Sequence, residues 1–346
     1  MRFLFLGAGA IGTYVGGSLA AAGHQVTYSE QPAAAEVIAR QGLRLTRGGR
    51  TTAVRNIAVF GSAEEALAAG PHDVGVFALK SFDTESALAG LLATGRELPP
   101  ILSLQNGVDN EPVIAAALGE VVTGTVTTAV AKPGTGQVVE EKRRGIGVAL
   151  DHPLSAALVA ALNDADLNAV GFAQAGPMKW SKLLTNLTGN ATSAILDQPV
   201  SALFADRRLY EVEVAVLREC LAVMAALGHR PVDLPGTPVR ALALAASRLP
   251  RFIAQPALTK ALGGGRGDKM PSFHIDLHSG RGRTEVSFLN GAVARYGAEH
   301  GVPTPVNTVL TATLEALSSG EQSLEIYRHN PEALLALLQV ARPSAG

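Results

Sequence analysis

Cysteine, long apolar runs and net charge are all scarce in this sequence, and each shortage excludes a class of protein. The single cysteine, Cys220, rules out a disulfide within the chain, and its place in the apolar run 217–224 predicts a buried structural thiol. No apolar run reaches the roughly 18 to 20 residues that a membrane-spanning helix needs. The formal net charge of −1 argues against general attraction to nucleic acid or anionic membranes. We therefore expect a cytoplasmic protein with small-molecule partners, not nucleic acid or membrane.

A glycine-rich turn follows the first predicted strand. The apolar residues 2–6 lead into Gly7-Ala8-Gly9-Ala10-Ile11-Gly12, and a helical pattern follows at once. In dinucleotide-binding folds the first glycine permits the tight turn, the second lets the backbone approach the pyrophosphate, and the third lets helix and strand pack closely. The phosphates then lie at the helix N-terminus. A secretory signal is the alternative, but the glycines and a second strand over 25–29 favour a dinucleotide site.

The end of the second predicted strand bears on the choice of cofactor. An acidic residue there binds the ribose hydroxyls of NAD, whereas a basic residue accepts the 2′-phosphate of NADP. This sequence has Glu30 and Gln31, and Glu30 favours NAD. Two alternatives stay open, namely that Arg40 or Arg44 folds back to hold a phosphate, and that Glu30 is only a solvated loop residue.

Two further predicted strands end in polar residues. Lys80 follows the buried run 73–79, and Asn106 follows the run 101–104 within a Gln-Asn-Gly sequence. Ligands of open parallel sheets bind beyond the carboxyl ends of the strands, so both side chains are expected in the same crevice as the glycine-rich turn. An Asn-Gly pair alone is most often a turn. The β-branched runs of 121–150 predict hairpin-like strands that complete the sheet, and 169–172 is expected to be a short last strand.

The alternation of strands and helices stops near residue 175. The length of 346 residues allows two domains, each with its own core. From residue 180 onward nearly every long segment repeats its apolar residues at helical spacing. We predict an α/β Rossmann domain over residues 1–174 and an all-α domain over 175–346.

A polar stripe follows the predicted boundary. Lys182, Asn186 and Asn190 are spaced at i, i+4 and i+8, beside an apolar stripe of leucines and alanines. Such a stripe aims a cation and two amides in one direction. The alternative is an ordinary solvated helix face, ended by Gly189 as a cap.

Polar residues also occur within two apolar stretches of the second half. Ser272 and Glu285 lie where helices are predicted to start, and capping alone would explain them. His274 and His278 have i, i+4 spacing, but no third ligand is evident, so we predict no metal site. The glycine run 263–267 is expected to be a flexible loop.

Together these residues resemble the ketopantoate reductase family of the 6-phosphogluconate-dehydrogenase-like reductases. The resemblance covers nearly the whole chain, and its order and spacing are more specific than any one piece. The matching pieces are the glycine-rich turn 7–12, Leu79-Lys80, Gln105-Asn106-Gly107, Trp180-Ser181-Lys182 with Asn186 and Asn190, Ser272 with Asp276, Thr284-Glu285, Leu289-Asn290-Gly291, and 301–307.

The resemblance implies a Rossmann domain followed by a helical domain, with the active site in the cleft between them. It implies reduction of 2-dehydropantoate to pantoate with NADPH, on the pathway to pantothenate and coenzyme A. Lys182 would be the general acid and Glu285 a catalytic residue that contacts the substrate hydroxyl. Substrate-binding roles would fall to Asn186, Asn190, Ser272 and Asn106, with Lys80 and Asn106 near the nicotinamide.

The sequence departs from the family pattern at three places. Gln31 replaces the usual arginine for the 2′-phosphate, Ser287 replaces an acidic residue, and the segment 263–282 is longer than in short members. NADH is therefore open as an alternative to NADPH, and a paralogue acting on another 2-keto acid is open too. The sequence is also compatible with a non-catalytic dinucleotide-binding regulator and with an amino-acid or opine-type dehydrogenase. It allows a homodimer as well.

Overall fold

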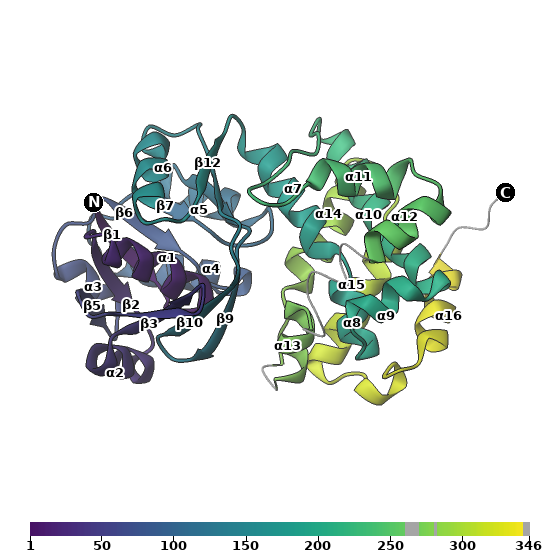
Figure 1. Ribbon diagram of the computed structural model, residues 1–346, viewed down its shortest axis with the longest axis horizontal. Coiled ribbons are helices and arrows are strands. Elements are labelled where there is room, and N and C mark those ends of the chain that lie inside the picture. The colour runs from purple at the N-terminus through teal and green to yellow at the C-terminus, as the bar shows by residue number, and fades with distance from the viewer. Residues whose placement is uncertain (260–269, 280–281, 342–346) are drawn as a thin grey trace. The chain divides into compact units, whose positions relative to one another are not determined.

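The computed structural model describes residues 1–259, 270–279 and 282–341, and the chain divides into two units (Figure 1). Unit 1 comprises Met1–Lys179 with Leu234–Thr237, and unit 2 comprises Trp180–Asp233 with Pro238–Gly346. The division falls inside helix α7 (Ala175–Leu187), whose first residue is where the sequence predicts the second domain to begin. The glycine run 263–267 lies outside the described residues.

Unit 1 is built on an eight-stranded sheet in the order β12-β11-β8-β7-β6-β1-β2-β5. All neighbouring strands are parallel except β8 and β11. Strands β1, β2 and β12 have the predicted bounds. The eight strands are β1 (Arg2–Leu6), β2 (Gln25–Ser29), β5 (Ile57–Phe60), β6 (Val74–Phe77), β7 (Ile101–Ser103), β8 (Val122–Val126), β11 (Ile146–Ala149) and β12 (Ala169–Phe172).

A second sheet of four strands, in the order β4-β3-β10-β9, accompanies the first. The prediction that the strands of 121–150 complete one sheet is therefore right for β8 and β11 and wrong for β9 and β10. The reason is a long-range parallel pairing of β10 with β3, in register Gln137 with Arg44, which no local pattern reveals. The strands are β3 (Leu43–Arg47), β4 (Arg50–Val54), β9 (Ala129–Gly134) and β10 (Gln137–Lys142).

Helix α1 (Ala10–Ala21) packs against both sheets of unit 1 (Figure 1). Two glycines make this close approach possible. A Cβ atom at Gly16 would lie less than 3.0 Å from the Tyr28 hydroxyl, and one at Gly17 would lie 2.7 Å from a methyl group of Leu45. The glycines that argued against a signal peptide thus allow the N-terminal helix to pack closely against both sheets. The remaining helices of unit 1 are α2 (Pro32–Gln41), α3 (Ala63–Ala68), the 3-10 turn η1 (Ser81–Asp83), α4 (Thr84–Ala93), α5 (Asn110–Leu118) and α6 (Ser155–Asp164).

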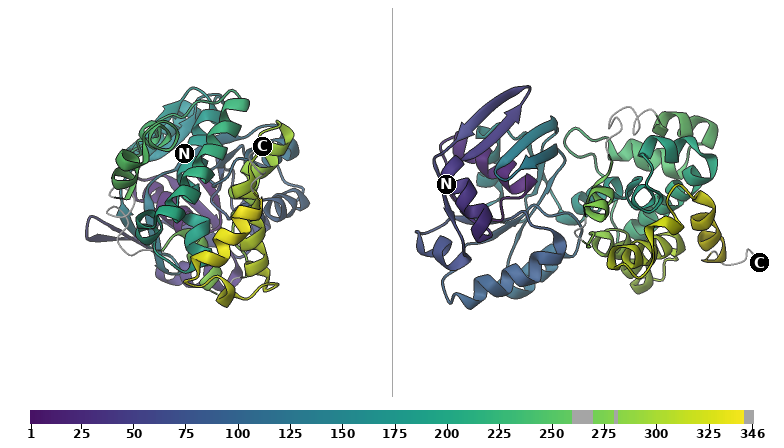
Figure 2. Two further views of the ribbon diagram at one scale, coloured as in Figure 1. Left: turned by 90° about the vertical axis from the view of Figure 1, so that its right-hand side faces the viewer. Right: turned by 90° about the horizontal axis from the view of Figure 1, so that it is seen from below.

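The described part of unit 2 consists of helices, which Figure 2 shows in teal, green and yellow. The predicted fold class, an α/β Rossmann unit followed by a helical unit, is confirmed. Cys220 is fully buried on α10, as predicted, and burial raises the pKa of its thiol. The elements are α8 (Asn190–Leu196), α9 (Val200–Ala205), α10 (Arg207–Ala226), α11 (Val239–Ser247), α12 (Arg251–Leu258), α13 (Ser272–His278), η3 (Val286–Phe288), α14 (Asn290–Glu299), α15 (Pro305–Ser319), η4 (Leu324–Ile326) and α16 (Pro331–Ala341).

The helix that carries Lys182 ends before Asn190. Gly189 has a φ of +64°, in the left-handed region, and α8 begins at the next residue. The buried carboxylate of Glu213 accepts a hydrogen bond from the Gly189 backbone N–H at 2.6 Å and so holds the break in place. The prediction of one continuous stripe is wrong for Asn190, because helical spacing cannot reveal a break of this kind. Among the described residues, none of the helices is both long and apolar enough to cross a membrane.

Candidate active site

The glycine-rich turn after β1 has two glycines that the protein itself requires and one that it does not. Gly7 has a φ of +88°, and a Cβ atom there would lie 2.6 Å from a methyl group of Leu79. A Cβ atom at Gly12 would lie less than 3.0 Å from the Gly7 carbonyl oxygen. At Gly9 the nearest atom would be the Ala78 carbonyl oxygen, 3.8 Å away. The space beside Gly9 fits the close approach of a pyrophosphate.

The start of helix α1 suits an anion. Gly9 is the N-cap residue, no side chain caps the helix there, and its first turn contains no acidic residue. The backbone N–H groups of a helix N-terminus and its positive dipole end favour phosphate. Residues Gly7, Ala8, Gly9, Ala10, Ile11 and Gly12 therefore fit the group that the sequence predicts, a dinucleotide, at the place where it is predicted.

Glu30 is drawn into this turn and is not merely a solvated loop residue. Its carboxylate accepts hydrogen bonds from the backbone N–H groups of Ala8 at 2.5 Å and of Gln31 at 2.8 Å. Gln31 itself is exposed at the start of α2. Arg40 lies near the other end of α2, about 13 Å along the helix at roughly 1.5 Å per residue, and pairs there with Glu36. An acidic group thus occupies the position that commonly selects between NAD and NADP.

Lys80 and Asn106 follow β6 and β7, which are parallel neighbours of each other, and β6 is also the parallel neighbour of β1. The glycine-rich turn, Lys80 and Asn106 therefore follow three adjacent strands at one edge of the sheet. The chain order reverses here, since β2 lies on one side of β1 and β6 on the other. Such a topological switch point is where open α/β sheets bind their ligands.

Buried amides brace the two loops that carry these residues. Gln105 is 2% exposed, and its amide donates hydrogen bonds to the Thr84 hydroxyl at 2.8 Å and to the Leu79 carbonyl at 3.3 Å. The Asn110 amide donates to the Asn106 carbonyl at 2.6 Å. The Gln105 contacts tie the loop after β7 to the segment after β6, and the Asn110 contact braces the loop after β7 from the start of α5.

One buried ion pair lies behind the same loop, and sequence reasoning missed it. The ammonium of Lys179 donates to the Gln105 carbonyl at 2.6 Å and to the carboxylate of Glu111 at 2.8 Å. Glu111 also accepts from the Ser103 hydroxyl at 2.7 Å. Lysine inside an apolar helical pattern was the available signal, but its partner is distant in sequence and could not be inferred from spacing.

In unit 2 the structure joins Lys182 to Asn186. The Lys182 ammonium donates to the Asn186 side-chain oxygen at 2.8 Å, and both side chains are half-buried on α7. The opposite face of the helix is anchored by Leu183, Leu184 and Leu187, each at most 1% exposed. A cation is thus held in a defined position on a rigid helix.

Asn190 faces a different element. Its amide donates to the Ser272 hydroxyl at 3.2 Å, and its side-chain oxygen accepts from the Phe273 backbone N–H at 3.0 Å. Asn190 is buried, whereas Ser272 is exposed at the start of α13. The predicted set therefore forms two pairs, Lys182 with Asn186 and Asn190 with Ser272.

Glu285 is 4% exposed and directly precedes the turn η3. Nearby Ser287 donates a hydrogen bond to the Glu315 carboxylate at 2.5 Å. Other residues of the family pattern have a structural role. Asn290 donates to Asn307 at 3.0 Å, and Asn307 donates to Glu219 at 2.6 Å, which links α14, α15 and α10.

An α/β unit with a glycine-rich turn at its switch point, followed by a helical unit, is the architecture of a two-domain NAD(P)-dependent oxidoreductase. The model of the family described as Ketopantoate reductase PanE/ApbA matches residues 3–148, and that of its C-terminal part matches residues 176–318. The chain belongs to the ketopantoate reductase family, as its sequence motifs predict.

Named relatives agree with this assignment. The 2-dehydropantoate 2-reductases of Archaeoglobus fulgidus and Pyrococcus horikoshii are 28% and 26% identical over 324 residues, each alignment covering 92% of this chain and 98% of the relative. A PanE/ApbA family ketopantoate reductase from Ralstonia eutropha JMP134 has a TM-score of 0.79 at 29% identity, covering 93% of this chain and 100% of the other. A D-mandelate dehydrogenase, determined with NADH and anilino(oxo)acetate, shares the fold with a TM-score of 0.75 at 21% identity, covering 92% of this chain and 99% of the other.

Proposed function

We propose that this enzyme reduces a 2-keto acid to the corresponding 2-hydroxy acid, with 2-dehydropantoate as the first candidate substrate. The observation that carries the proposal is the Lys182 ammonium, held 2.8 Å from Asn186 on a helix that buried leucines anchor. Family membership supports the reaction type, and the 2-dehydropantoate 2-reductases among its relatives support the candidate substrate.

Reduction of a ketone needs a proton donor as well as a hydride. A bound reduced nicotinamide would supply the hydride, with the dinucleotide held by the glycine-rich turn and α1. The keto oxygen gains negative charge as the hydride arrives, and Lys182 stabilises that charge and then transfers its proton to the oxygen. Asn186 keeps the ammonium in position through its side-chain oxygen. The side chains of Lys80 and Asn106 would lie near the nicotinamide ring of the bound cofactor.

The substrate carboxylate requires hydrogen-bond donors. The exposed hydroxyl of Ser272 and the amide of Asn190 provide them, and Asn190 is itself fixed by the Phe273 backbone. Glu285 would accept a hydrogen bond from the substrate hydroxyl. The acidic partner that the family usually has two residues further on is absent, and Ser287 binds Glu315 there instead. This difference supports a 2-keto acid with another substituent as the second candidate.

We propose further that this enzyme discriminates against NADH less strongly than its family usually does. The carboxylate of Glu30 lies within the turn, where it would accept bonds from the ribose hydroxyls and repel a 2′-phosphate. Arg40, at the far end of α2 with Glu36, is poorly placed to compensate. Binding of NADH at least about a hundredfold weaker than that of NADPH would contradict this proposal.

The decisive experiment measures NADH and NADPH oxidation with a panel of 2-keto acids. The panel includes 2-dehydropantoate, branched aliphatic acids and aryl acids, the last because a D-mandelate dehydrogenase shares the fold. Turnover that Lys182→Ala abolishes supports the proposal. Cofactor binding without turnover of any acid would overturn it in favour of a regulator. Turnover that requires ammonia or an amine would favour an amino-acid or opine-type dehydrogenase.

A further inference from the structure

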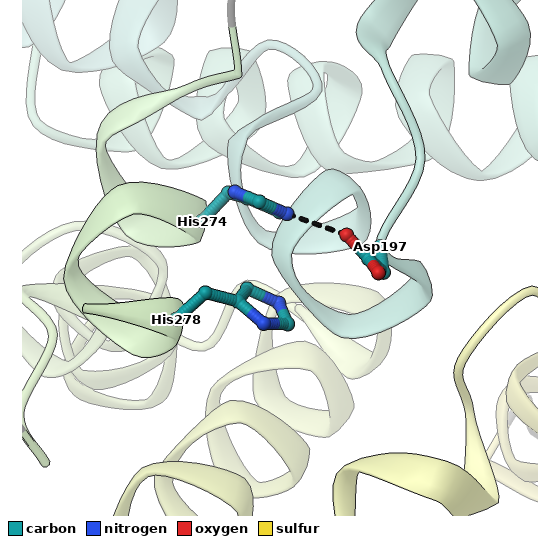
Figure 3. Close-up of side chains that lie close together, drawn as sticks. All are labelled: Asp197, His274 and His278. Carbon is teal, nitrogen blue, oxygen red and sulfur yellow. Dashed lines mark hydrogen bonds and ion pairs between the residues drawn. The ribbon is translucent and has the colours of Figure 1, made fainter. Parts of the chain in front are cut away.

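Unit 2 contains a cluster of potential metal ligands that the proposed reaction does not use. Asp197, His274 and His278 each offer one ligand atom, and these atoms all lie within 4.8 Å of one another. Figure 3 shows the two imidazoles on one helix, turned toward the aspartate, which follows the end of a second helix. The third ligand that the sequence did not reveal is thus supplied from a distant part of the chain.

The local fold explains how the three side chains meet. His274 and His278 lie one helical turn apart on α13, and their rings stack with centroids 4.1 Å apart. Asp197 is the C-cap residue of α8, with a left-handed φ of +51°. Its Oδ1 atom accepts a hydrogen bond from Nε2 of His274 at 2.6 Å. That hydrogen bond lowers the pKa of the Asp197 carboxyl.

The donor set has a definite chemical preference. Two imidazole nitrogens and one carboxylate oxygen suit zinc and the neighbouring divalent transition metals, at bond lengths of about 2.0 to 2.2 Å. A tetrahedral site would bring the ligand atoms to roughly 3.3 Å from one another. Two movements would achieve this: the exposed His278 ring turns inward, and Nε2 of His274 and Oδ1 of Asp197, now 2.6 Å apart, move about 0.7 Å away from each other. We propose that Asp197, His274 and His278 form a site for a divalent transition-metal ion, with zinc as the best match.

Binding would replace a proton with the metal. In the present arrangement His274 shares an N–H proton with Asp197, and the ion would take its place between the same two atoms. Metal binding is therefore coupled to the release of that proton. A water molecule would complete the fourth position, as in zinc sites with three protein ligands.

Two further side chains approach the same carboxylate, and one of them, Arg328, carries a positive charge that opposes the ion. Nε of Arg328 lies 3.2 Å from Oδ2 of Asp197, and Nε2 of His329 lies 3.9 Å from it. Both are on the oxygen that His274 does not contact. The Arg328 charge repels a dication across a partly solvated site, so its removal strengthens metal binding. An increase in metal affinity on removal of Arg328 therefore indicates a metal site. In a purely structural ion-pair network, Arg328 would instead be one more favourable partner of Asp197.

The site would join two helices that are already linked near their first residues. Asn190 and Ser272 begin α8 and α13 and are hydrogen-bonded to each other. Asp197 caps the other end of α8, and His278 ends α13. A bound ion would therefore join the C-terminal ends of the two helices, whose N-terminal ends are already joined by the hydrogen bond. The inference does not depend on the proposed function, since it concerns other side chains.

The test uses untagged, full-length protein stripped with a chelator, because a histidine tag binds the same metals. Titration with Co²⁺ should produce the visible absorption bands of a tetrahedral site at one equivalent, and Zn²⁺ should displace them and raise Tm. His278→Gln and Asp197→Asn should each weaken binding at least about tenfold. Arg328→Gln should tighten it roughly threefold to tenfold.

His300→Gln is the matched control, since His300 is an exposed histidine at the end of α14. The His300→Gln variant should bind the metal with the same affinity as the wild type. His278 is exposed, so His278→Gln is expected to fold, which circular dichroism verifies. Absence of a one-equivalent site in the wild type would overturn the proposal. Equal affinities for wild type, His278→Gln and His300→Gln would overturn it as well.

Discussion

The ammonium of Lys179 and the carboxylate of Glu111 form an ion pair of 2.8 Å, with side chains only 5% and 9% exposed. Lys179 also holds the Gln105 carbonyl, next to the proposed cofactor residue Asn106. Removing one partner of a buried pair leaves an uncompensated charge, which costs more than the pair itself contributes. This lysine, three residues before Lys182, therefore has a structural task distinct from catalysis.

Lys179→Met should lower the free energy of unfolding by about 3 to 5 kcal/mol, measured by urea denaturation. The double variant Lys179→Met with Glu111→Gln should recover part of that loss, because no charge is then left buried alone. Lys132→Met serves as control, since Lys132 is exposed on β9. A loss below about 1 kcal/mol in Lys179→Met would contradict a structural role for the buried pair.

The glycines of the turn should respond differently to alanine. Gly9→Ala should keep its Tm, because the added methyl group meets nothing closer than 3.8 Å, but it should weaken NAD(P)H binding at least about tenfold. Gly12→Ala should instead lower the free energy of unfolding by about 1 to 3 kcal/mol, because its methyl group collides with the Gly7 carbonyl. Cofactor fluorescence titration and thermal unfolding separate the two effects. Unchanged NAD(P)H binding in Gly9→Ala would contradict the placement of the pyrophosphate beside Gly9.

Lys182→Ala should fold normally, bind NAD(P)H and lose roughly 10² to 10⁴ in kcat, because the proton donor is gone. Asn186→Ala should cost less, since it removes only the group that positions the ammonium. Steady-state kinetics with the best acid of the panel provides the measurement. Lys132→Ala is again the control, and undiminished turnover in Lys182→Ala would exclude Lys182 from the mechanism.

Gln31→Arg should shift the cofactor preference toward NADPH. A guanidinium at this exposed position can bind the 2′-phosphate, which should tighten NADPH binding by about tenfold and leave NADH nearly unchanged. Isothermal titration of both cofactors measures the ratio. Arg40→Gln tests the competing idea that Arg40 folds back, and a loss of NADPH affinity in that variant would support the competitor.

Local patterns predicted the main features of unit 1 because its strands are short, apolar and bounded by turn residues. The bounds of β1, β2 and β12 agree with the prediction residue by residue. The second sheet was not predicted, because it depends on β10 pairing with a strand more than ninety residues earlier. Sequence spacing describes each strand but not the partner it will choose.

The candidate site, like unit 1, was predictable in its local patterns but not in its long-range contacts. Polar residues at strand ends and the Lys182–Asn186 spacing were visible in the sequence, and their roles stay proposals that the variants above test. A helix end at Gly189 was one of the alternatives that the sequence left open, but its stabilisation by Glu213 from another helix was not predictable. Asp197 was invisible for the same reason, since only the folded chain brings it to His274 and His278.

The break at Gly189 also separates the two pairs of candidate site residues, so that each pair has its own helical support. Lys182 and Asn186 lie on the helix before it, whereas Asn190 opens the helix after it and contacts Ser272. Substitutions in the second pair, the proposed substrate-binding residues, would alter which acid is held, while the proposed proton donor keeps its own helical support. A scaffold arranged in this way can acquire new substrates without having to rebuild its chemistry.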